Sequence, residues 1–110
     1  MNTYQEHDAR ILKQIYLDMC TNEGIKPINI YFGRCGRGGA KCTYKANKPL
    51  YIVIDLSAIQ VGSIYALCHE VAHQINIISG NATHNNAFKK TEKHLLKKYS
   101  NTPAARGLYW

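Results

Sequence analysis

The chain is a basic sequence of 110 residues with 14 Lys and Arg residues, 7 Asp and Glu residues and a formal net charge of +7. Hydrophobic residues make up 45% of it, which excludes a disordered chain. No apolar run reaches the roughly 20 residues of a membrane-spanning helix. The length predicts a single domain over residues 1–110. We expect a monomer without a membrane partner, and the charge suits either a polyanionic partner or solubility.

The N-terminus and the cysteines predict a cytoplasmic protein. Residues 1–6 contain no basic start followed by an apolar stretch, so we expect no secretory signal. The four cysteines, Cys20, Cys35, Cys42 and Cys68, include no Cys-x-x-Cys pair and are expected to stay reduced. Cys68 lies in an apolar helical stretch and is predicted to be a buried small hydrophobe. The spacing of Cys35 and Cys42 is a weak signal for a metal site or a disulfide.

The first half of the chain predicts one helix followed by three strands. Residues 3–20 form the helix, with Thr3 and Glu6 as a capping box and apolar residues at helical spacing. Pro27 prevents its continuation. Alternating or β-rich segments at residues 28–32, 41–45 and 50–56 follow, separated by glycine-rich or proline-containing turns. We predict a small three-stranded antiparallel sheet.

The second half predicts two helices and a tail. Residues 57–79 are helical, with a break or a fresh start at Gly62-Ser63. An apolar stripe on this helix consists of Ile64, Leu67, Cys68, Val71, Ile75 and Ile78. Thr83 is the predicted N-cap of a helix that ends near Tyr99, and its buried face contains Phe88, Leu95 and Tyr99. Residues 100–110 are expected to be irregular. The predicted fold class is therefore α+β.

His69-Glu70-Val71-Ala72-His73 is a His-Glu-x-x-His motif in the middle of this helix. Histidines at positions i and i+4 project from one helical face and can bind the same Zn²⁺ ion. Zinc lowers the pKa of a bound water to about 7, and Glu70 beside it can accept the proton and pass it to a leaving amine. The motif predicts a zinc hydrolase that cleaves peptide bonds.

A catalytic zinc needs a third protein ligand and one open position. His84 follows the motif closely, where the next helix begins, and is the favoured third ligand. Glu92, on that helix, is the alternative. His94 is surrounded by lysines and is expected to face solvent. Tyr44 and Tyr65 are possible donors to a developing oxyanion.

The chain resembles the SprT-like (Spartan-like) zinc metallopeptidase family. That family has His-Glu-x-x-His, a short connection, and a histidine followed four residues later by an aromatic residue. The matching stretch here is His84-Asn85-Asn86-Ala87-Phe88. The resemblance implies that His84 is the third ligand, that Phe88 packs behind it, and that the fold is a minimal zincin-like core.

Two departures from the family pattern bear on the substrate. The family's glycine after the third histidine is Asn85 here, and no cysteine follows Cys68, so we expect no C-terminal zinc ribbon. Spartan-type members cleave proteins that are crosslinked to DNA. The resemblance implies a protein substrate, with DNA-associated proteins as one class of target. It leaves the identity of that substrate open.

Basic residues suggest a nucleic-acid contact as well. The glycine-rich stretch of residues 33–39 contains Arg34 and Arg37, and Lys41 follows it. Tyr31 and Tyr44 flank these basic residues. Cations can contact phosphates there while tyrosines stack on bases. A solvated turn explains the same residues. The alternative function is a non-catalytic module that binds nucleic acid or protein through its basic faces and uses zinc only structurally.

Overall fold

The computed structural model describes residues 1–36 and 38–110 and confirms the α+β class. In these residues the elements follow in the order α1 (Thr3–Glu23), β1 (Asn29–Phe32), β2 (Ala40–Lys45), β3 (Lys48–Ile54), α2 (Ser63–Ile78), α3 (Asn86–Tyr99) and α4 (Pro103–Arg106). Among the described residues, every helix is too short or too polar to traverse a lipid bilayer.

Helix α1 begins with a different capping box from the predicted one. Asn2 is the N-cap: its side chain accepts a hydrogen bond from the Gln5 N–H, and the Gln5 side chain accepts one from the Asn2 N–H. The prediction of Thr3 and Glu6 was wrong by one residue, because Asn serves as an N-cap as well as Thr does. The helix ends at Glu23, and Gly24 follows with a φ of 67°.

The sheet is mixed, so the prediction of an all-antiparallel sheet was wrong. The strand order is β1-β3-β2, with β1 parallel to β3 and β2 antiparallel to β3. The prediction assumed that neighbours in sequence are neighbours in the sheet. Instead β3, which contains the buried residues Ile52, Val53 and Ile54, takes the central position, where apolar side chains lose the most contact with water. This order leaves β2 with a free edge.

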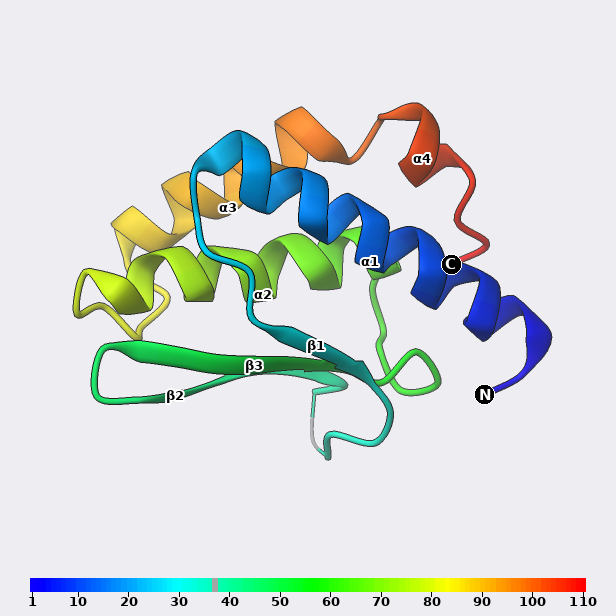
Figure 1. Cartoon of the computed structure of the whole chain (residues 1–110), viewed down its shortest axis with the longest axis horizontal. Coiled ribbons are helices and arrows are strands. Elements are labelled where there is room, and N and C mark those ends of the chain that lie inside the picture. The colour runs from blue at the N-terminus through cyan, green and yellow to red at the C-terminus, as the bar shows by residue number, and fades with distance from the viewer. Residues whose placement is uncertain (37) are drawn as a thin grey trace.

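The helices all lie on one side of the sheet (Figure 1). Helix α2 packs directly on β2 and β3, and α1 and α3 pack on α2. Strand alternation directs Ile52 and Ile54 of β3 into the core, together with their partners Cys42 and Ala40 on β2. The inward face of β2 therefore lies against the helix that carries the His-Glu-x-x-His motif.

Helix α2 starts at Ser63, so the predicted fresh start is confirmed and the helix predicted over residues 57–62 is wrong. Within the stripe, Leu67, Cys68 and Val71 are fully buried, whereas Ile78 at the helix end is 55% exposed. Helix α3 is capped by Asn85 and not by Thr83. Its predicted face is confirmed, since Phe88, Leu95 and Tyr99 are all buried.

The C-terminal segment is more ordered than predicted. It contains the short helix α4, which Thr102 caps. The buried carboxylate of Asp8 accepts hydrogen bonds from the N–H groups of Tyr109 and Trp110, at 2.9 and 3.0 Å. The Trp110 carbonyl in turn accepts from the N–H and the hydroxyl of Ser63. This segment thus ties the start of α1 to the start of α2.

Candidate metal centre

Helix α2 presents His69 and His73 on one face, one turn apart. Their ring centroids lie 4.9 Å from each other. Both side chains are partly buried, whereas Glu70, Val71 and Ala72 between them are buried. The helix is held against the sheet and α1 by its apolar stripe, so its motif face is fixed next to β2.

His84 lies in the loop between α2 and α3, two residues before α3 begins. The loop is held by asparagine side chains. The side-chain Oδ1 of Asn81 accepts from the Thr83 N–H and hydroxyl, and the side-chain Nδ2 of Asn81 donates to Oδ1 of Asn85 at 2.8 Å. Asn85 also caps α3 by accepting from the Phe88 N–H. These bonds define the path of the backbone on both sides of His84.

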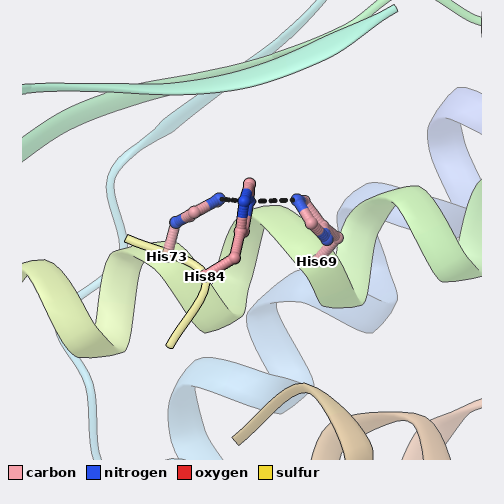
Figure 2. Close-up of side chains that lie close together, drawn as sticks. All are labelled: His69, His73 and His84. Atoms are coloured by element: carbon pink, nitrogen blue, oxygen red, sulfur yellow. Dashed lines mark hydrogen bonds between the residues drawn. The ribbon is translucent and has the colours of Figure 1, made fainter. Parts of the chain in front are cut away.

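Figure 2 shows the ring nitrogen of His84 between those of His73 and His69, with a hydrogen bond to each. His84 Nε2 lies 3.0 Å from His73 Nε2 and 3.2 Å from His69 Nε2. The three ligand atoms all lie within 4.8 Å of one another, so these residues are close enough to hold a metal ion. The structure therefore brings together the motif histidines and the predicted third ligand.

Phe88 closes the side of the cluster that faces the core. Its ring centroid lies 5.0 Å from that of His69, 4.4 Å from His73 and 4.8 Å from His84. Phe88 is only 2% exposed. The expectation that this aromatic residue packs behind the third histidine is confirmed, and one side chain limits the movement of all three imidazoles.

Glu92, the alternative third ligand, has a different place. Its Oε2 lies 2.5 Å from Nδ1 of His69, on the ring atom that faces away from the histidine cluster. Since a carboxylate accepts hydrogen bonds, Nδ1 of His69 carries the proton, and Nε2 of a neutral ring keeps its lone pair for a metal. The sequence contained the residue but no signal for this role, because the contact joins two helices.

The protonation of His73 also suits metal binding. Burial lowers the pKa of its imidazole to about 4, and the neighbouring rings of His69 and His84 act in the same direction. His73 is therefore neutral at neutral pH, which is the form that binds metals.

Glu70 is only 4% exposed and lies next to His69 in the chain. Burial raises the pKa of its carboxyl to about 7, although His69 and the backbone N–H of Cys42 oppose this shift. A carboxyl with such a pKa is half ionised near neutral pH and can both accept and release a proton.

Two cavities open along α2, and they share Ala40, His69 and Glu70. The histidine cavity, of about 320 Å³, is lined by Ala40, Lys41, Cys42, Tyr44, His69, Glu70, His73, Ile77, Ala82 and His84. The apolar pocket, of about 310 Å³, is lined by Gly38, Ala40, Ile59, Val61, Tyr65, Ala66, His69 and Glu70. The pair lies between the inward face of β2 and the motif face of α2, with Glu70 at their junction.

Of the basic residues predicted to contact nucleic acid, the two in the described part of the chain line different cavities. Lys41 lines the histidine cavity. Arg34 lines a separate cavity with Asp55 and Ser57, and Arg37 lies outside the described residues.

The sequence analysis singled out two tyrosines and two cysteines besides these residues. Tyr44 lines the histidine cavity and Tyr65 the apolar pocket. Cys35 and Cys42 are free thiols. Burial and the nearby Glu70 raise the pKa of the Cys42 thiol to about 12, so it is neutral at neutral pH.

Comparisons of this chain with protein-family models, with curated proteins and with solved structures find no match.

Proposed function

We propose that this protein is a zinc-dependent metallopeptidase in which His69, His73 and His84 hold one Zn²⁺ ion. The convergence of three imidazole Nε2 atoms beside a buried glutamate is the observation that carries the proposal. Three neutral nitrogen ligands with one open position are the donor set of many catalytic zinc sites. The resemblance of the motif and of His84 and Phe88 to the SprT-like family supports the same assignment.

The spacing of the ligand atoms fits zinc. Tetrahedral coordination at 2.0–2.1 Å places two ligating nitrogens about 3.3 Å apart. Two of the three Nε2 pairs lie at 3.0 and 3.2 Å, and all three ligand atoms lie within 4.8 Å of one another. A zinc ion there would acidify a bound water and polarise the substrate carbonyl.

Glu70 has the position and the protonation for the acid–base role. It lines the same cavity as the three histidines, and burial favours the protonated form of its carboxyl, whereas a bound cation would favour the ionised form that accepts a proton. Glu70 takes a proton from the attacking water and then gives it to the nitrogen of the cleaved peptide bond. The burial that raises its pKa also makes it a stronger base than an exposed carboxylate.

The free edge of β2 supports a peptide as the substrate. An extended peptide can pair with the unpaired N–H and C=O groups of an edge strand. Ala40, Lys41 and Cys42 of this strand line the histidine cavity, so a peptide bound along it passes the cluster. We propose that the substrates are unfolded or extended segments of proteins, including DNA-associated proteins.

The Glu70→Gln variant tests the proposal directly. We expect the purified zinc-loaded chain to cleave an unfolded protein such as reduced casein. Glu70→Gln should retain stoichiometric zinc, measured by elemental analysis, and lose at least about 100-fold in cleavage rate, since general acid–base catalysis contributes that much. Glu6→Gln, an exposed glutamate on α1, is the matched control and should cleave normally.

Two results would contradict the proposal. One is cleavage by Glu70→Gln at the rate of the unaltered chain. The other is stoichiometric zinc without any cleavage, combined with binding of single-stranded DNA, which would favour the non-catalytic binding module with a structural zinc.

A further inference from the structure

We propose that the apolar pocket is a specificity pocket that receives one apolar side chain of the peptide substrate, of the size of Leu, Ile or Met. This inference rests on the proposed peptidase function and names a determinant of its substrate choice. The pocket is the cavity defined above by Ile59, Val61, Tyr65, Ala66 and the residues that it shares with the histidine cavity.

Its position relative to the metal centre is the first argument. The histidine cavity extends along α2 toward Ile77, whereas the apolar pocket extends the other way, toward Tyr65 and Ala66. Glu70 lies where the two cavities meet. A peptide that runs along β2 past Glu70 therefore carries a side chain next to its reacting bond over the apolar pocket.

The chemistry of the lining is the second argument. Among the described residues, Glu70 is the only charged group in the wall, and it lies at the junction rather than in the interior. Val61 and Tyr65 are 45% and 42% exposed, which is high for apolar side chains that line a concave surface. An apolar substrate side chain would remove this surface from water, whereas a charged one would lose hydration and, among the described residues of the wall, would find a charged partner only in Glu70 at the junction.

The third argument is that the pocket is preformed. Ile59, one of its walls, is 7% exposed and packs against the backbone of Gly39 at the start of β2. Its N–H donates to the Asp55 carbonyl, and Gly39 accepts from the Asp55 N–H at 2.6 Å. These contacts join the loop before α2 to β2. The pocket has a volume of about 310 Å³, at the lower limit for ligand pockets, which suits a single side chain.

A cleavage-site profile tests the pocket on substrates of many sequences at once. The zinc-loaded chain is incubated with a mixture of short random peptides, and the new termini are read by mass spectrometry. We expect one position beside the cleaved bond to be enriched at least about 10-fold in Leu, Ile and Met over Ala, the usual discrimination of an apolar pocket.

The Val61→Asp variant should change this preference. Val61 lies at the exposed rim, so the substitution spares the core, and a carboxylate there should shift the enrichment toward Lys and Arg. The matched control is Leu17→Asp on α1, where a leucine that is 41% exposed lies outside the pocket. The control should keep the original profile.

A binding measurement separates this inference from the proposed function. Labelled Ala-Gly peptides with a single Leu, Ala or Lys are titrated into the Glu70→Gln chain and followed by fluorescence anisotropy. Preferential binding of the Leu peptide, lost in the Val61→Asp background, supports the pocket even if no peptide is cleaved. Glu70-dependent cleavage with no preference at any position would overturn the pocket and leave the peptidase in place. Absence of both cleavage and preferential binding would overturn both.

Discussion

At the residue scale, the proposed metal centre depends on contacts that orient each imidazole. His69 is held by Glu92 at Nδ1, and Phe88 packs against all three rings. A carboxylate behind a ligand histidine fixes both the tautomer and the direction of the ring. Glu92 is therefore a positioning residue, and its effect should be visible in the affinity for zinc.

Removal of the Glu92 carboxylate should weaken zinc binding by about 10–100-fold, the usual effect of losing such a partner. The measurement is a competition titration of Glu92→Ala with a chromogenic chelator. Glu92→Gln should recover part of the affinity because its amide oxygen can still accept from Nδ1. Glu6→Ala, on the exposed part of α1, serves as the control. An affinity unchanged by Glu92→Ala would refute the positioning role.

At the element scale, the junction between β2 and the loop before α2 shapes both cavities. Gly39 has a φ of 77°, and a Cβ added to it would lie 2.8 Å from the Ile59 nitrogen and 2.9 Å from its Cγ2. Only glycine fits this approach, because a side chain would be strained by the backbone and blocked by a neighbouring backbone atom. The close packing of Ile59 on the stretch between β1 and β2 thus requires a glycine at position 39.

Gly39→Ala should lower the free energy of unfolding by about 2–4 kcal/mol, since it combines backbone strain with overpacking. Gly33→Ala is the matched substitution in the same loop, because an added Cβ there meets nothing within 4 Å and the φ is not positive. It should change stability by no more than about 0.5 kcal/mol. Urea unfolding of the two variants gives the comparison, and equal midpoints would show that the close approach is not needed.

At the scale of the whole molecule, Glu23 connects the end of α1 to α3. Its carboxylate accepts hydrogen bonds from His94 at 2.8 Å, from Lys98 at 2.8 Å and from Tyr99 at 2.7 Å. Partial burial raises the pKa of Glu23, but these three bonds outweigh it and lower the pKa from 4.5 to about 2. His94, expected to face solvent, is 54% exposed yet takes part in this link.

This depressed pKa predicts how stability depends on pH. A carboxyl whose pKa is lower in the folded state stabilises the fold fully above its unfolded pKa of 4.5 and loses that contribution as pH falls toward 2. Glu23→Gln should therefore cost about 2–3 kcal/mol at pH 7. The difference from the unaltered chain should shrink between pH 4.5 and pH 2. Urea unfolding over this range checks it, with Glu6→Gln as control; a constant difference would contradict the assignment.

Local patterns in the sequence were sufficient for the three long helices and for the histidines that the structure brings together. Helical spacing located α1, α2 and α3, and the i, i+4 histidines with Glu70 needed only the geometry of one helix. His84 could be predicted because it follows α2 after a short connection and lies in a stretch that resembles a family motif. A short connection limits the positions that this residue can take relative to α2. The helix caps were missed by one or two residues because Asn2 and Asn85 compete with neighbouring Thr3 and Thr83 for that role.

By itself, then, the sequence determined the α+β composition, the motif helix and the three histidines, because each depends on interactions between residues close in the chain. Only the tertiary structure decided that β3 lies between β1 and β2, since strand order reflects burial of the most apolar strand over the whole sheet. It also decided that Glu92 contacts Nδ1 of His69 outside the histidine cluster, and that Ile59, Val61 and Tyr65 line one pocket beside Glu70. These contacts join elements far apart in sequence, and no local pattern specifies the distance at which they pack.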